Sequence, residues 1–271
     1  GMTLLPQALK DQGYSTHMLG KWHLGLGTSD MVPTKRGFDT WLGFFAGAED
    51  HWNHRRTELR RSLVDLWFND RPATQFARKD QYGDELFTTR FEKLVQEHPL
   101  SKPLFVYYAY QVPHEPLQSP RKFLKKYAEF QDIKGDNDWH YVERNGLGLS
   151  RQEAPKRRAQ YHAMVTFLDH SVGRVERALK SRHMWESSLV VFATDNGGAT
   201  GHDADVGNNW PLRGAKYSDY EGGVRGICFV TGGVLPVDRW GLDLTDRRYR
   251  VSIADWYATF VELAGGVLED R

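Results

Sequence analysis

Short apolar runs rich in β-branched and aromatic residues predict the strands of a sheet. Leu104–Tyr110 predicts a central strand, and Leu189–Ala193 predicts a buried strand. Gly226–Thr231 predicts a further strand, and the segment that starts at Tyr14 predicts a short one with a bend at Gly20. Polar residues follow the first two runs. In open α/β sheets, ligands collect just outside the carboxyl ends of the strands.

Apolar residues at helical spacing predict four helices. The strongest period runs through Met164, Val165 and Leu168. The predicted helices are Thr3–Gly13, Asp80–His98, Lys156–Arg182 and Ser252–Ala264. Strands and helices alternate, which predicts an α/β fold with a mostly parallel central sheet flanked by helices. The polar segment 130–156 is predicted to be a surface loop insertion in one domain that spans residues 1–271.

Composition narrows the classes of function. The 271 residues carry a net charge of +1, which gives no support for the basic face that nucleic-acid binding needs. No apolar run is long enough to span a bilayer, and no signal segment opens the sequence. The one cysteine, Cys228, lies in a predicted strand and is interpreted as an inert core thiol.

A candidate metal site follows the predicted strand Leu189–Ala193. Asp195 and Asn196 stand side by side before two glycines. A carboxylate and a side-chain amide are hard oxygen donors of the kind that Ca²⁺ or Mg²⁺ accepts. The alternative is an Asx turn, because Asp, Asn and Gly are also the residues of ordinary loops.

A candidate oxyanion site lies near the N-terminus. Lys21 and His23 are two residues apart, so in extended backbone their side chains share one side. A cation and an imidazole together suit sulfate or phosphate. The alternative is a solvated lysine beside an ordinary loop histidine.

Two further histidine-containing segments carry polar chemistry. His114 stands between two prolines just past a predicted strand, which gives a rigid mounting for its side chain or, alternatively, a capping histidine in a turn. The segment Glu49–Arg61 holds a cluster of histidine and acidic residues whose spacing matches no metal-ligand pattern. We interpret it as a solvated surface near the mouth of a cleft.

Five segments match, in the same order, the motifs of a known family. They are Gly13–Gly25, Pro33–Asp39, Val112–Gln118, Asp195–Gly198 and Asn209–Gly226. Together they resemble the type I sulfatases, most closely the arylsulfatase B (N-acetylgalactosamine-4-sulfatase) branch. The resemblance covers nearly the whole chain apart from 130–156, and five ordered motifs are far more specific than any one of them. It implies an alkaline-phosphatase-like fold.

The resemblance implies hydrolysis of sulfate esters of sugars or aryl groups. Sulfatases of this type use a formylglycine, made from a cysteine or serine, as the nucleophile beside a metal ion. Asp195 and Asn196 would ligate that metal, which is expected to be Ca²⁺, with Mg²⁺ as an alternative.

The resemblance also implies roles for four other side chains. Lys21 and Lys216 would neutralise the charge of the sulfate. His23 would hold the formylglycine hydrate and serve as the base for sulfate release. His114 would contact the sulfate and assist the leaving alcohol.

The sequence departs from the family at its nucleophile. The pattern Cys/Ser-x-Pro/Ala-x-Arg is absent, and Cys228 is followed by Phe229 and Val230 in the wrong part of the chain. The family's adjacent Asp-Asp pair is absent as well. We therefore expect an N-terminally incomplete fragment that lacks the first strand and the nucleophile helix and is inactive alone. The family resemblance implies a lysosomal or secreted protein, whose targeting segment would lie outside this chain.

Two other functions stay open at this point. One is a non-catalytic protein that only binds sulfated polysaccharide, with Lys21, Lys216 and a cluster of arginines between residues 55 and 61 as cationic contacts. The other is a phosphate-ester hydrolase of the same superfamily. The expected partner is a sulfated carbohydrate or an aryl sulfate, with no nucleic acid and no membrane span.

Overall fold

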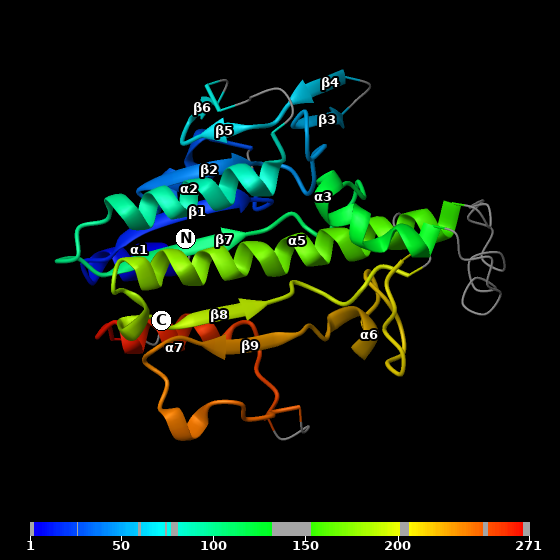
Figure 1. Ribbon diagram of the computed structural model, residues 1–271. Coiled ribbons are helices and arrows are strands. Elements are labelled where there is room, and N and C mark those ends of the chain that lie inside the picture. The colour runs from blue at the N-terminus through cyan, green and yellow to red at the C-terminus, as the bar shows by residue number, and fades with distance from the viewer. Residues whose placement is uncertain are drawn as a thin grey trace. The chain divides into compact units, whose positions relative to one another are not determined.

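The computed structural model divides into two compact units (Figure 1). It describes residues 3–25, 27–58, 61–73, 75–76, 81–131, 153–200, 206–245 and 249–267. Unit 1 comprises Gly1–Tyr110, Ala178–Met184 and Leu235–Arg271, and unit 2 comprises Gln111–Arg177 and Trp185–Val234.

Unit 1 contains the larger sheet and the helices that cover it. Its helices and strands are α1 (Leu5–Asp11), β1 (Ser15–Lys21), η1 (Ser29–Met31), η2 (Pro33–Lys35), β2 (Thr40–Phe44), β3 (Arg55–Glu58), β4 (Arg61–Val64), β5 (Trp67–Phe68), β6 (Arg71–Pro72), α2 (Gly83–Glu97), β7 (Leu104–Ala109), η5 (Val237–Arg239) and α7 (Asp255–Leu263). The last residues of α5 (Glu153–Ser181) also belong to this unit. The prediction of helices at the two chain ends and before β7 is confirmed.

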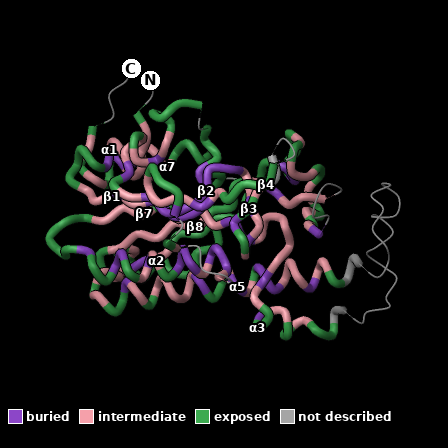
Figure 2. Tube along the Cα trace, turned by 90° about the horizontal axis from the view of Figure 1, so that it is seen from above, coloured by how far each residue is buried: buried purple, intermediate pink, exposed green. Residues whose placement is uncertain are grey.

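The strand order of the larger sheet is β6-β5-β2-β1-β7. β1 is parallel to both β2 and β7, whereas β5 is antiparallel to β2 and to β6. Helices α1 and α7 cover one face, and α2 covers the other (Figure 2). The α/β fold is therefore as expected, with a mixed sheet whose centre is parallel. β7 is the last strand in this order and is only half-buried, so its prediction as a central strand is wrong for the described part.

Helix α2 forms because its apolar side chains repeat every three or four residues. Leu86, Phe87, Phe91, Leu94 and Val95 are all buried, as the pattern predicts. Asp84 and Glu85 in the first turn complement the positive end of the helix dipole.

Two glycines let the parallel strands approach closely at their carboxyl ends. Gly20 has φ +84°, and a Cβ atom there would lie 2.0 Å from the carbonyl oxygen of Ala109 in β7. A Cβ atom on Gly43 of β2 would lie 1.9 Å from the carbonyl oxygen of Gly20. Gly20 has an unusual backbone conformation, as the predicted bend suggested. The strand nevertheless continues through Gly20 to Lys21, which the sequence did not predict.

Unit 2 is built around the long helix α5. Its other elements are α3 (Arg121–Leu124), η3 (Lys125–Gln131), η4 (Trp185–Ser187), β8 (Val190–Ala193), α6 (Glu221–Val224) and β9 (Cys228–Thr231). Phe123 of α3 packs edge-on against Phe167 of α5, with ring centroids 5.5 Å apart. The buried row of α5 follows Ala159, Ala163 and Phe167 at a spacing of four. The predicted stripe is therefore slightly misplaced, because Val165 is exposed.

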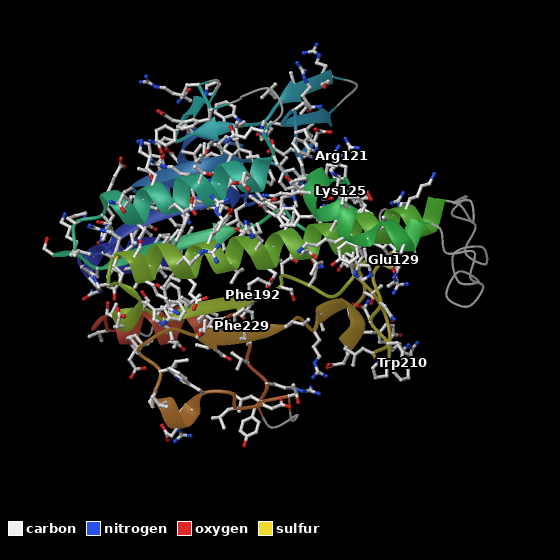
Figure 3. All side chains as sticks on the ribbon, viewed as in Figure 1. Arg121, Lys125, Glu129, Phe192, Trp210 and Phe229 are labelled. Atoms are coloured by element: carbon white, nitrogen blue, oxygen red, sulfur yellow. The ribbon has the colours of Figure 1, made fainter. Side chains whose placement is uncertain are left out.

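Strands β8 and β9 form a separate antiparallel pair. Phe192 and Phe229 stack across it, with ring centroids 4.9 Å apart (Figure 3). β8 is half-buried to exposed rather than buried, and Cys228 in β9 is exposed, so both burial predictions are wrong. The small pair has no further strand to shield it within the described residues.

Two predictions concern regions that the structure covers only in part. The proposed loop insertion 130–156 lies mostly outside the described residues, and its end from residue 153 belongs to α5. Within the part of the chain that is described, no helix combines the length and apolar character needed to cross a membrane.

Candidate active site

The first group of candidate residues lies at the carboxyl end of β1 in unit 1. Lys21 is the last residue of β1, pairs in register with Phe44 of β2 and is half-buried. The backbone N–H of Trp22 donates to the carbonyl of Phe44 at 2.9 Å. Lys21 therefore stands at the edge of the parallel strands where α/β proteins bind ligands.

His23 leaves the strand in a constrained conformation. Its φ of +50° lies in the left-handed region, which non-glycine residues rarely adopt. The prediction that Lys21 and His23 share one side of extended backbone is therefore wrong. The His23 N–H donates to the carbonyl of Phe45 at 3.1 Å. Its ring lies against Gly47, where a Cβ atom would come within 2.8 Å of Cε1 and 3.0 Å of Nε2.

A half-buried carboxylate fixes the loop behind His23. Asp65 accepts hydrogen bonds from the backbone N–H groups of Phe45 and Ala46 at 3.2 and 2.9 Å and from the indole N–H of Trp67 at 2.9 Å. Burial raises the pKa of Asp65 although these three donors oppose the shift. These hydrogen bonds hold the backbone just after β2, where the carbonyl of Phe45 accepts from the His23 N–H.

The prediction of a solvated surface for Glu49–Arg61 holds only in part, because Asn53, Arg55 and Arg61 are exposed but three other side chains are buried. Glu49, His51 and His54 are buried, and His54 Nδ1 lies 2.8 Å from Glu49 Oε1. Burial raises the pKa of Glu49 well above its ordinary value and lowers the pKa of His54 to about 4. The pair is a buried hydrogen bond within unit 1. Among the described residues, no three His, Cys, Asp or Glu side chains gather as a metal site.

The second group of candidate residues lies in unit 2, where two of the predicted residues meet. Lys216 Nζ is 3.0 Å from His114 Nε2, although 102 positions separate them in the chain. His114 Nδ1 lies 3.0 Å from the carbonyl oxygen of Glu115. Because a carbonyl only accepts, Nδ1 carries the ring proton and Nε2 accepts from the Lys216 ammonium. The ammonium also lies 5.2 Å from the ring centroid of Tyr217.

The Asp195–Asn196 turn is fastened to the same loops. Gly197 N–H donates to the carbonyl of Gly223 at 2.9 Å, and Lys216 N–H donates to the carbonyl of Gly198 at 3.1 Å. Asp195 is exposed and Asn196 is half-buried. The Asn196 amide nitrogen donates to the carbonyl of Gly197 at 2.7 Å, which differs from the bond of an Asx turn, where a side-chain oxygen accepts from the N–H two residues on.

Asn209 is a residue whose role sequence reasoning missed. Its side chain accepts from Gly198 N–H and donates to the carbonyls of Gly198 and Gly214, at 2.9, 2.9 and 3.2 Å. It thereby closes the loop that carries Lys216 against the turn that carries Asp195. The signal that could have indicated such a clamp is a side-chain amide, which can both donate and accept, placed between glycine-rich turns.

Each unit therefore presents one set of the predicted residues. Unit 2 joins His114 and Lys216 directly and ties them through backbone contacts to the Asp195–Asn196 turn. Unit 1 presents Lys21 and His23 at the carboxyl ends of its parallel strands. An ammonium that donates to an imidazole nitrogen sets a positive charge beside a proton-transfer group, which suits binding of an oxyanion and proton transfer to its ester oxygen.

The comparisons with known proteins agree with one another. A family model described as sulfatase matches residues 1–267. Arylsulfatase J of Mus musculus is 35% identical over 267 residues, which cover 98% of this chain and 39% of that protein. N-acetylgalactosamine-6-sulfatase of Canis lupus familiaris is 26% identical, over 97% of this chain and 45% of that protein. The chain thus spans less than half the length of these curated relatives.

Solved structures show the same relationship. The crystal structure of Ps i-CgsB is 26% identical and superposes with a TM-score of 0.75, over 99% of this chain and 54% of that one. The same protein in complex with k-i-k-neocarrahexaose is 25% identical, with a TM-score of 0.74 over 100% of this chain and 56% of that one. With the family model matching almost the whole sequence, the chain belongs to the sulfatase family.

Proposed function

We propose that this chain is part of the catalytic domain of a sulfuric ester hydrolase that acts on sulfate esters of sugars or aryl groups. The observation that carries the proposal is the 3.0 Å contact between Lys216 Nζ and His114 Nε2, fastened beside the Asp195–Asn196 turn. A paired ammonium and imidazole favour a bound anion, and a carboxylate–amide turn favours a cation next to it.

The proposed roles follow from the atoms that each side chain offers. Lys21 and Lys216 neutralise the sulfate charge. With Nδ1–H of His114 directed at the Glu115 carbonyl, Nε2 accepts from the Lys216 ammonium, and in the proposed reaction a proton passes from that ammonium through Nε2 to the oxygen of the leaving alcohol. His23 serves as the base for sulfate release, and its ring orientation is limited by the wall at Gly47.

The donor atoms present fit part of a Ca²⁺ site. Asp195 supplies carboxylate oxygens, and Asn196 supplies Oδ1 because its nitrogen is used by the Gly197 carbonyl. Ca²⁺ takes six to eight oxygen ligands, so these two side chains would be a partial set. When bound, the metal polarises a sulfate oxygen, and the formylglycine supplies the nucleophile. The nucleophile motif and the remaining acidic ligands are not in this sequence.

The relatives support sulfate esters over other substrates. The two curated proteins described above are named as sulfatases, and the structural neighbour was solved with a bound neocarrahexaose. These names favour the sulfatase function over the phosphate-ester alternative, and the sugar-bound neighbour is consistent with a carbohydrate substrate.

We expect the 271-residue chain to hydrolyse neither aryl nor sugar sulfates at a measurable rate, because two side chains do not complete a Ca²⁺ shell and no nucleophile motif is present. The full-length product of the gene is expected to hydrolyse 4-nitrophenyl sulfate faster than 4-nitrophenyl phosphate. The measurement is release of 4-nitrophenol by both proteins with both esters. Turnover by the short chain, or a preference of the full-length protein for phosphate, would contradict the proposal.

A further inference from the structure

An exposed tryptophan stands on the loop that carries Lys216. Trp210 is 85% exposed, and Tyr217, next to Lys216, is 74% exposed. Figure 3 shows Trp210 at the outer end of its loop, away from the body of the ribbon. A single exposed apolar ring is common on protein surfaces, and what distinguishes this one is its place on the loop that carries Lys216.

We propose that Trp210 is a stacking platform for a pyranose ring, so that the substrate is a sulfated oligosaccharide rather than a small aryl sulfate. This inference rests on the proposed function, since it takes the Lys216–His114 pair as the sulfate site. A pyranose presents a face of C–H groups, which carry partial positive charge. The face of an indole carries the negative end of its quadrupole, and the two surfaces therefore attract while both leave water.

The backbone of Trp210 is fixed although its ring is exposed. Its N–H donates to Asn208 Oδ1 at 3.0 Å, and Leu212 N–H donates to the carbonyl of Asn209 at 2.7 Å across the tryptophan. A ring held on an ordered backbone loses little conformational freedom when it binds a ligand. This is the arrangement expected of a binding side chain rather than of a mobile surface residue.

The same clamp brings the backbone of Trp210 near the backbone of Lys216. Asn209, the neighbour of Trp210, bonds Gly198, and Gly198 in turn accepts from the N–H of Lys216. Consecutive Cα atoms are about 3.8 Å apart, so Trp210 begins within a few residue lengths of the Lys216 backbone. A sugar one or two units from the sulfated one can reach the indole, whereas inorganic sulfate or a single aryl ring at Lys216 does not need it.

A second exposed tryptophan provides a matched control. Trp240 is 61% exposed and belongs to unit 1, and its indole N–H donates to the carbonyl of Leu235 at 3.1 Å. It shares exposure and residue type with Trp210 but none of the contacts to the Lys216 loop. Trp240→Ala therefore measures the general effect of removing a surface indole.

The test is isothermal titration of the 271-residue chain with inorganic sulfate and with hexasaccharides of chondroitin sulfate and heparin. Trp210→Ala is expected to weaken hexasaccharide binding at least tenfold and to leave sulfate binding unchanged. Trp210→Phe is expected to stay within about threefold of the parent chain, because a phenyl face still stacks. Trp240→Ala is expected to bind both ligands as the parent does. Circular dichroism checks that each variant is folded.

The other outcomes separate this inference from the proposed function. If sulfate binds but neither hexasaccharide binds more tightly than sulfate, the platform is wrong and the sulfate site stands. Equal hexasaccharide binding by the parent chain and Trp210→Ala also overturns the platform. If the parent chain binds no sulfate and no hexasaccharide, the sulfate site itself fails, and the inference fails with it. A loss of self-association in Trp210→Ala without a change in hexasaccharide affinity would assign the ring to a protein contact instead.

Discussion

Lys216→Ala is expected to lower kcat of the full-length protein on a sulfate ester about 100- to 1,000-fold, the usual cost of removing one preorganised charge-stabilising donor. The structure gives the reason: the ammonium donates to His114 Nε2, so its loss removes both a positive charge and that hydrogen bond to the imidazole. Steady-state kinetics on 4-nitrophenyl sulfate measure the effect.

The control for this variant is Lys180→Ala, which removes an exposed lysine from the last turn of α5. Its kcat should stay within about twofold of the parent, because exposed charges are well screened by salt. If Lys216→Ala retained nearly full kcat, the Lys216–His114 pair would be a structural contact and not part of the reaction.

Gly20→Ala is expected to destabilise the chain by about 4 kcal/mol or more, or to prevent soluble expression. The added Cβ would lie 2.0 Å from the carbonyl oxygen of Ala109, and φ at this position is +84°. Neither strand can move away without breaking the parallel pairing of β1 with β7. Costs above about 4 kcal/mol are rare for single substitutions and point to such backbone collisions. Urea unfolding followed by circular dichroism measures the change.

Substitutions at two other glycines distinguish the effect of the steric collision at Gly20 from the effect of backbone strain. Gly25 has φ +96°, but no heavy atom lies within 4 Å of the place that a Cβ atom would take, so Gly25→Ala should cost only about 1–2 kcal/mol. Gly27 has open space and no positive φ, so Gly27→Ala should change the unfolding free energy by about 0.5 kcal/mol or less. Three equal losses would show that the close approach of β1 to β7 is not what makes Gly20 necessary.

The helices were predictable because their information is local. In α2 the positions of Phe87, Phe91 and Leu94 follow directly from a period of three and four, and all three are buried. Strand burial was less predictable, since it depends on which segments lie on each face of a sheet. Cys228 looks like a core residue in sequence, but the β8–β9 pair leaves it exposed.

Polar residues were the least predictable part of the fold. The histidines and acids after residue 48 look solvated in sequence, yet Glu49 and His54 are buried because each satisfies the other. The wall that Gly47 makes for the His23 ring also depends on a contact across 24 positions. Such pairings arise only when the chain folds back on itself.

The order of the sequence motifs was enough to identify the candidate residues of the site. The five ordered segments contain Lys21, His23, His114 and Lys216, and the last two of these residues touch in the fold. The local contacts that hold them were not visible in the motifs. Asn209 and Asp65 act by bonding backbone groups that only the fold brings within reach.

The most direct test of the central claim is a sulfate titration followed by NMR of the histidine rings. If Lys216 and His114 bind one anion, the ring signal of His114 shifts with a Kd that Lys216→Ala raises at least tenfold, while the exposed His183 stays unchanged. The variant His114→Gln assigns the signal. An unchanged His114 signal, or an equal Kd in Lys216→Ala, would contradict the account.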